Sequence, residues 1–153
     1  MKTNPEDFKD VKVMIIDDDT FLLDMYSMKF KKYGFQVNIA LNGKDAISKL
    51  EEGYAPDVIL SDVVMPYMNG VDFLKNIREK KLAENAIVIM LTNQGQADDL
   101  AAVKPYHVDD YIIKALAIPT EVVEKVIEVF YRVRPQARPE GRTGSVRPQQ
   151  SVS

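Results

Sequence analysis

Residues 56–70 read PDVILSDVVMPYMNG, and this stretch carries most of the information about the fold. Its apolar run, residues 58–60, is short and continuous, which is typical of a strand covered on both faces, as in a parallel sheet. The run leads to an acidic residue, Asp62. Residues 70–81 follow with apolar side chains at helical spacing, which are Val71, Leu74 and Ile77. The stretch therefore predicts a strand, a polar strand end and a helix.

The same alternation continues on both sides of this stretch. Further apolar runs occupy residues 11–16, 35–40, 87–91 and 111–113. Segments with helical spacing lie between and after them, at residues 21–33, 43–52, 96–104 and 119–131. This order predicts an α/β protein, a (βα)5 doubly wound five-stranded parallel sheet with helices on both faces. Ligands of such sheets bind at the carboxyl ends of the strands, so candidate site residues are sought there.

The bulk composition restricts the class of protein. The hydrophobic fraction is 46% and the charged fraction 28%, as in a soluble globular protein. A net charge of −3 is too small to indicate nucleic acid or an acidic membrane as a partner. The absence of cysteine excludes disulfides and thiolate metal sites. The polar N-terminus lacks the apolar core of a signal peptide, and no apolar run approaches the ~20 residues of a membrane span, so we expect a cytoplasmic protein.

The 153 residues allow one ordinary domain, which we place at residues 11–133 after an N-terminal extension, 1–10. Residues 134–153 read RPQARPEGRTGSVRPQQSVS, an Arg- and Pro-rich segment with no large apolar residue beyond two valines. Such a segment cannot bury enough surface to offset the entropy of ordering, so we expect a disordered tail. The alternative is a basic tail that contacts nucleic acid or an acidic partner.

Acidic residues end two of the predicted strands. Asp17 and Asp18 follow the first strand, and Asp62 ends the third. Carboxylates gathered at one sheet edge repel one another, and a hard divalent cation such as Mg²⁺, which prefers oxygen ligands, removes that cost. The alternative for this acidic run is helix capping, with Asp19 or Thr20 as the cap of the first helix. Asp62 alone has a similar capping alternative.

The fourth strand ends at Thr92 and the fifth at Lys114. A hydroxyl group and an ammonium group at this edge would supply a hydrogen-bond donor and a positive charge to a phosphorylated carboxylate. Taken singly, Thr92 is a common strand residue and Lys114 could be a surface lysine. The combination of an acid pair, a further acid, a hydroxyl and a lysine at one rim is the stronger signal.

These residues, in this order, resemble the receiver domain of two-component response regulators. The resemblance covers approximately residues 11–132, through the segments VMIIDDDTF, PDVILSDVVMPYMNG, IVIMLTN and DDYIIKA. It implies a flavodoxin-like receiver fold. It also implies a single-domain response regulator that accepts a phosphoryl group from a histidine kinase on Asp62 and switches partner binding in two-component signal transduction.

The resemblance assigns a role to each matching position. Asp62 would be the phosphoryl acceptor, and Mg²⁺ would be held by Asp17, Asp18, Asp62 and the backbone carbonyl of Val64. Thr92 and Lys114 would contact phosphoryl oxygens.

Two positions concern switching and access. Tyr111 matches the aromatic residue whose rotamer, with Thr92, reports phosphorylation. The alternative is an ordinary strand aromatic. The sequence departs from the family where Ala115 replaces the proline after Lys114, which puts the aim of that lysine in doubt. Asn93 replaces the usual small residue after the threonine and narrows the expected access to the acceptor.

The resemblance also implies partners. These are a sensor histidine kinase or phosphotransfer protein, and an unknown downstream protein that docks on the face of the fourth helix, fifth strand and fifth helix. Neither direct DNA binding nor membrane association is expected. The chain would assist its own phosphorylation and dephosphorylation without being a multiple-turnover enzyme.

Two rival interpretations remain. Phosphatases of the haloacid dehalogenase type also use an aspartate after the first strand, but they need Asp-x-Asp-x-Thr. The run of residues 17–20, DDDT, misplaces the threonine by one position. The other rival is a receiver-like scaffold that takes no phosphate and binds its partners constitutively.

Overall fold

The computed structural model describes residues 3–93 and 97–139. The strands are β1 (Lys12–Ile16), β2 (Gln36–Ala40), β3 (Val58–Asp62), β4 (Ile87–Thr92) and β5 (Asp110–Ile113). The helices are α1 (Thr20–Lys32), α2 (Gly43–Glu51), α3 (Gly70–Glu79), α4 (Ala97–Val103) and α5 (Pro119–Val133). Short 3₁₀ turns are η1 (Pro5–Phe8), η2 (Lys104–Tyr106), η3 (Lys114–Leu116) and η4 (Pro135–Ala137).

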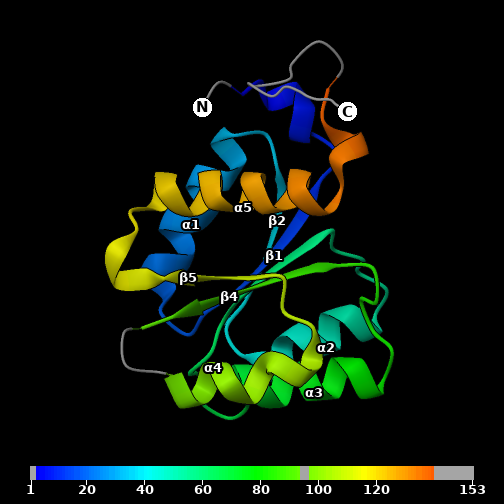
Figure 1. Cartoon of the computed structure of the whole chain (residues 1–153), viewed down its shortest axis with the longest axis vertical. Helices are drawn as coiled ribbons and strands as arrows, with labels where there is room; N and C mark the ends of the chain where they lie inside the picture. Colours follow the sequence, from blue (N-terminus) through cyan, green and yellow to red (C-terminus); the bar gives the residue numbers. More distant parts are fainter. Residues whose placement is uncertain (1–2, 94–96, 140–153) are drawn as a thin grey trace.

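All five strands join one parallel sheet in the order β2-β1-β3-β4-β5. This is the flavodoxin-like order of a doubly wound sheet, and it confirms the predicted fold class. Figure 1 shows α1 and α5 on one face of the sheet and α2, α3 and α4 on the other. The carboxyl ends of β1, β3, β4 and β5, from which the candidate residues come, therefore meet at one edge.

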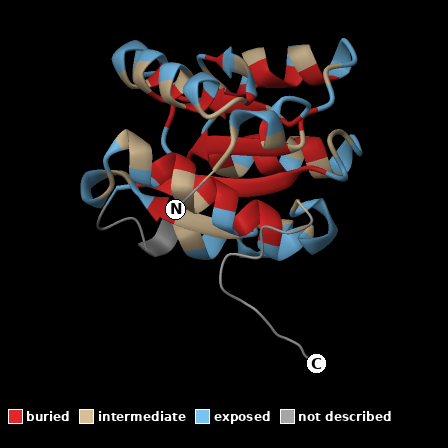
Figure 2. Ribbon diagram, turned by 90° about the horizontal axis from the view of Figure 1, so that it is seen from above, coloured by how far each residue is buried: buried red, intermediate tan, exposed pale blue. Residues whose placement is uncertain are grey.

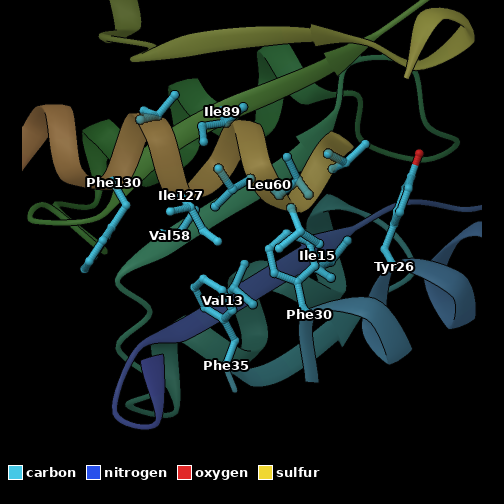
Figure 3. Close-up of a cluster of buried hydrophobic side chains, with 14 of the residues drawn as sticks. Val13, Ile15, Tyr26, Phe30, Phe35, Val58, Leu60, Ile89, Ile127 and Phe130 are labelled. Atoms are coloured by element: carbon cyan, nitrogen blue, oxygen red, sulfur yellow. The ribbon is translucent and has the colours of Figure 1, made fainter. Parts of the chain in front are cut away.

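The core consists of two apolar layers, one on each side of the sheet. Successive residues of a strand point to opposite faces, so Val13 and Ile15 pack towards α1 and α5, whereas Met14 and Ile16 pack towards the other three helices. The buried sheet lies between helices whose outer surfaces are exposed (Figure 2). Figure 3 shows the α1–α5 side, where Phe30 and Phe35 pack against the side chains of the central strands.

The N-terminal segment belongs to this core. Phe8, at the end of η1, has no exposed surface. Its ring stacks on Phe35 with centroids 4.6 Å apart and lies 5.9 Å from the ring of Tyr131 on α5. The packed domain therefore begins before residue 11, where the sequence had placed its boundary.

The domain also continues past residue 133. The guanidinium group of Arg134 donates to Asp57 Oδ1 at 2.9 Å and to the carbonyl of Asn85 at 2.6 Å. Arg138 lies over the ring of Tyr131, 4.7 Å from its centroid. The first part of the tail that we predicted to be disordered is thus ordered against the domain, whereas residues 140–153 lie outside the described residues.

Candidate functional site

The acidic part of the site is built by two neighbouring strands. Ile16 of β1 pairs with Ser61 of β3, so the residues that follow them, Asp17 and Asp62, stand side by side at the sheet edge. Asp17 has no exposed surface and Asp62 is 4% exposed, whereas Asp18 is exposed. Asp17, Asp18 and Asp62 each offer a carboxylate oxygen within 4.8 Å of the others. The sequence-predicted acids therefore converge.

Helix capping accounts for Asp19 and not for the acids before it. The Asp19 side chain accepts the N–H groups of Phe21 and Leu22 at the start of α1. Thr20 is the first helical residue, so the capping interpretation holds for Asp19 alone. Asp17 instead accepts the Asp19 N–H at 2.9 Å, and its side chain is fully buried.

Lys114 reaches into the acidic cluster from the end of β5. Its Nζ lies 2.9 Å from Asp17 Oδ2 and 3.2 Å from Asp62 Oδ2. The lysine side chain is 12% exposed, so it is not a solvent-facing surface lysine. Ala115 follows Lys114 where the family has proline, and no cis peptide bond is present among the described residues. The Lys114 ammonium group is nevertheless held by two carboxylates.

Burial and charge act on Asp62 in opposite directions. Desolvation raises the pKa of Asp62 to about 6, with the nearby Asp17 charge acting in the same sense, while Lys114 lowers it. The pKa of Lys114 is raised, because its hydrogen bonds and charge pairs with Asp17 and Asp62 outweigh the effect of burial. Asp62 Oδ1 is buried and has no hydrogen-bond partner in the described part of the chain.

These features fit a divalent cation. The cluster holds three carboxylates, and the Lys114 ammonium group contacts two of them, so the cluster keeps an excess of negative charge. One oxygen of Asp62 is free to act as a ligand. Mg²⁺ takes oxygen ligands and commonly needs only one or two carboxylates from the protein. The cluster therefore fits a Mg²⁺ site by its donor atoms and by its charge.

Thr92 and Val64 lie near Asp62. Thr92 is 2% exposed, and it follows Leu91, the β4 partner of Asp62. Its hydroxyl donates to the carbonyl of Asn93 at 3.1 Å. The Val64 N–H helps to lower the pKa of Asp62, and Val64 itself is 50% exposed. Both residues lie at the expected rim, and their roles towards phosphate and metal stay predictions.

Tyr111 lies in β5, three residues before Lys114. It is partly buried against the core layer formed with α2, α3 and α4, and desolvation raises its pKa. This placement suits both a switch residue and an ordinary strand aromatic, so the switch role also stays a prediction.

Tyr26 is a neighbour of the site that the sequence did not reveal. It is 2% exposed on the inner face of α1, at one end of the apolar cluster in Figure 3. Burial raises the pKa of its hydroxyl, the charge of Lys114 lowers it, and the charges of Asp17 and Asp62 raise it again. The helical pattern placed Tyr26 in the core, and nothing in that pattern distinguishes it from an ordinary core aromatic.

The loop after Asp62 returns sharply to the start of α3. Asn69 caps this helix by accepting the Asp72 N–H at 2.9 Å, and the Gly70 N–H donates to the Val63 carbonyl at 2.6 Å. A Cβ atom on Gly70 would lie 2.7 Å from the backbone carbonyl oxygen of Asp62. Glycine is therefore required here by a close approach to the backbone of Asp62.

We expect Gly70→Ala to destabilise the fold by about 1–3 kcal/mol, because backbone atoms beside Asp62 would have to move. Gly43 is a matched control, since it also begins a helix after an asparagine cap. A Cβ atom there would meet only the flexible side chain of Met68, at 3.0 Å. Urea denaturation followed by circular dichroism should show the larger loss for Gly70→Ala, and equal losses would contradict the close-approach argument.

Comparison with known proteins agrees with this geometry. The family model described as the response regulator receiver domain matches residues 13–127. The chain belongs to the response regulator receiver family. The domain is thus a receiver of two-component systems, and receiver domains are signalling proteins rather than multiple-turnover enzymes. Within the described part of the chain, no helix combines the length and apolarity needed to cross a membrane.

Relatives include receivers of different total length. The receiver is 34% identical over 119 residues to the chemotaxis protein CheY of Thermotoga maritima, covering 77% of this chain and 96% of that protein. It is 29% identical over 126 residues to the phosphate regulon transcriptional regulatory protein PhoB of Escherichia coli. That match covers 82% of this chain and 54% of PhoB, so the chain spans about half the length of that relative.

A solved structure supports the fold assignment. The chemotaxis response regulator CheY4 of Vibrio cholerae superposes with a TM-score of 0.70 at 27% identity. The superposition covers 78% of this chain and 98% of that one. The receiver therefore shares both the fold and the family with chemotaxis-regulator-like proteins.

Proposed function

We propose that this receiver accepts a phosphoryl group on Asp62 from the phosphohistidine of a sensor histidine kinase or phosphotransfer protein. The observation that carries the proposal is the placement of Lys114 against Asp62, beside a buried Asp62 oxygen with no hydrogen-bond partner among the described residues. Asp17, Asp18, Asp62 and the carbonyl of Val64 would hold Mg²⁺. Thr92 and Lys114 would contact the phosphoryl oxygens.

In the transfer step a carboxylate oxygen of Asp62 attacks the phosphorus in line with the leaving imidazole nitrogen. The phosphorus–nitrogen bond breaks as the phosphorus–oxygen bond forms, and catalysis consists mainly of positioning and charge stabilisation. Bound Mg²⁺ would supply positive charge to the transferring group. Lys114, already 3.2 Å from Asp62 Oδ2, can pair with a phosphoryl oxygen without crossing the site. Water later hydrolyses the acyl phosphate and restores the carboxylate.

The output is a switch in partner binding. The new charge on Asp62 would draw the Thr92 hydroxyl from the Asn93 carbonyl and leave space for Tyr111 to turn inward. A downstream protein would then recognise the face of α4, β5 and α5. The proposal thus describes a receiver that assists its own phosphorylation and dephosphorylation and is not an enzyme for an external substrate.

The test is Mg²⁺-dependent labelling with a small acyl phosphate, followed by intact-mass measurement and mapping of the modified residue. The protein should gain the mass of one phosphoryl group, and Asp62→Asn should gain none. Asp19→Asn is the matched control, because asparagine preserves the cap of α1 and Asp62 is unchanged. Labelling at another residue, or none, would refute the proposal. Continuous phosphate release from a monoester would favour a phosphatase, and lack of labelling would favour the constitutive scaffold.

A further inference from the structure

A single arginine fastens the connection between α4 and β5 to helix α3. Arg78 Nε–H donates to the carbonyl of Tyr106 at 2.8 Å, and its Nη2 donates to the carbonyl of His107 at 3.0 Å. The two carbonyls are consecutive, so one planar guanidinium group spans one peptide unit. These bonds join residues 28 and 29 positions apart in the chain. Charged donors make stronger hydrogen bonds than neutral ones.

The connection that Arg78 holds is a tight reversal. After α4 the chain makes the 3₁₀ turn η2, and His107 then adopts a left-handed conformation with φ of 59°. A residue with a Cβ atom is disfavoured in that region, and it persists there only where the surroundings hold it. The Tyr106 and His107 carbonyls are the groups to which Arg78 donates. The guanidinium group therefore stabilises the reversal although His107 is in the disfavoured left-handed conformation.

The start of β5 is anchored on two further sides. Asp109 accepts the Val88 N–H on its carboxylate and donates its own N–H to the Val88 carbonyl, both at 2.8 Å. Arg132 of α5 donates to the Asp109 carbonyl at 3.1 Å and to Asp110 Oδ2 at 3.0 Å. One end of β5 is therefore tied to α3, β4 and α5. Its other end leads into Lys114 and the phosphoacceptor site.

We propose that Arg78 is a clamp on the α4–β5 connection, residues 104–108. It would keep this connection fixed as one end of the output face, by which we mean the face formed by α4, β5 and α5. This inference rests on the proposed function, because it concerns how modification of Asp62 reaches that face. When the connection is held on α3, a rearrangement around Asp62 at the sheet edge moves α4 about its C-terminal end and leaves the connection in place. Loss of the clamp would let the connection move as well and would uncouple the output face from the state of Asp62.

Hydrogen exchange resolved to short peptides tests the clamp, with and without acyl phosphate and Mg²⁺. In the unaltered protein we expect amides of residues 104–108 to keep their protection on phosphorylation, while amides of α4, Ala97–Val103, exchange faster. Arg78→Gln should accelerate exchange at residues 104–108 by at least about tenfold before any phosphorylation, because two charged hydrogen bonds are lost. Arg78→Lys, with one donor group, should give an intermediate rate.

The control is Lys75→Gln, an exposed position on the same helix, which should leave exchange at residues 104–108 unchanged. Labelling of Asp62 should proceed in Arg78→Gln, since Arg78 lies outside the acidic cluster. Unchanged exchange in Arg78→Gln, or loss of protection at 104–108 when the unaltered protein is phosphorylated, would overturn the clamp. Failure of labelling in every variant would refute the proposed function, while the exchange measured without phosphate would still report on the clamp's contacts.

Discussion

Lys114→Ala is expected to destabilise the metal-free protein by about 3 kcal/mol, because removing one partner from a buried ion pair leaves uncompensated charge. Asp17 is fully buried and Asp62 nearly so, and Lys114 is the cation that contacts both in the described structure. Without its ammonium group the two buried carboxylates would repel each other with no cation between them. The loss should be measurable by urea denaturation in the presence of a chelator.

The same substitution should increase the effect of Mg²⁺ on stability. In the unaltered protein the ammonium group already neutralises part of the negative charge of the carboxylates. In Lys114→Ala all of this negative charge is available to attract the metal. The gain in unfolding free energy on adding Mg²⁺ should therefore be larger in the variant, as expected for a ligand that binds only the folded state. The rate of phosphoryl incorporation should nevertheless fall, because a positive charge for the phosphoryl oxygens is missing.

Lys125 provides the matched control for this experiment. It also contacts two carboxylates, Asp110 and Glu128, but its side chain is 36% exposed and lies on α5 away from the acidic cluster. Lys125→Ala should cost less than about 1 kcal/mol, and its stability should respond to Mg²⁺ as the unaltered protein does. If Lys114→Ala behaved in the same way, the ammonium group would not be what balances the buried carboxylates.

The convergence of the site could be predicted because it depends on topology. In a parallel sheet, every strand delivers its last residue to the same edge, so the positions of Asp17, Asp62 and Lys114 followed from the order of apolar runs. The pairing within the rim could not be predicted in this way. Lys114 lies nearer to Asp17 than to Asp62, and the Thr92 hydroxyl is directed to the Asn93 carbonyl, because these choices depend on rotamers and local backbone geometry.

The contacts of Arg78 were also invisible to sequence reasoning. The helical pattern of residues 70–81 correctly assigned the inner face of α3 to Val71, Leu74 and Ile77, since apolar side chains recur with the helical period. An arginine on such a helix normally indicates a solvated face. Its donors here reach backbone carbonyls more than 25 residues away, and backbone acceptors carry no signature in the identity of the residues that own them.

The ends of the domain also could not be located from sequence patterns. Apolar periodicity placed the first boundary at residue 11, and the change of composition after residue 133 placed the second. Phe8 is a lone aromatic in a polar segment, and Arg134 lies in an Arg- and Pro-rich segment, so neither contributes to any period. Both are nevertheless held by specific contacts, a ring stacked on Phe35 and a guanidinium group bound to Asp57. Isolated anchors of this kind are found only from the three-dimensional structure.

Phe8→Ala should accordingly destabilise the domain by about 3–5 kcal/mol, the range for truncating a buried aromatic side chain. The Phe8 ring fills the end of the α1–α5 core layer, between Phe35 and Tyr131. Its removal leaves a cavity that the backbone cannot easily close, because Gly34, next to Phe35, already lies so close to Pro5 that a Cβ atom there would overlap the Pro5 carbonyl. Urea denaturation followed by circular dichroism gives the loss as a fall in the midpoint at constant slope.

Phe21→Ala separates this effect from a general response to losing a phenylalanine. Phe21 is 70% exposed on the first turn of α1, so its truncation should change the unfolding free energy by no more than about 0.5 kcal/mol. Equal, small losses for the two variants would mean that residues 1–10 are an extension outside the packed domain, as predicted from the sequence. A large loss confined to Phe8→Ala would mean that the segment before β1 completes the core, because the free energy of burying one ring depends on where it packs and not on the polarity of its neighbours in the chain.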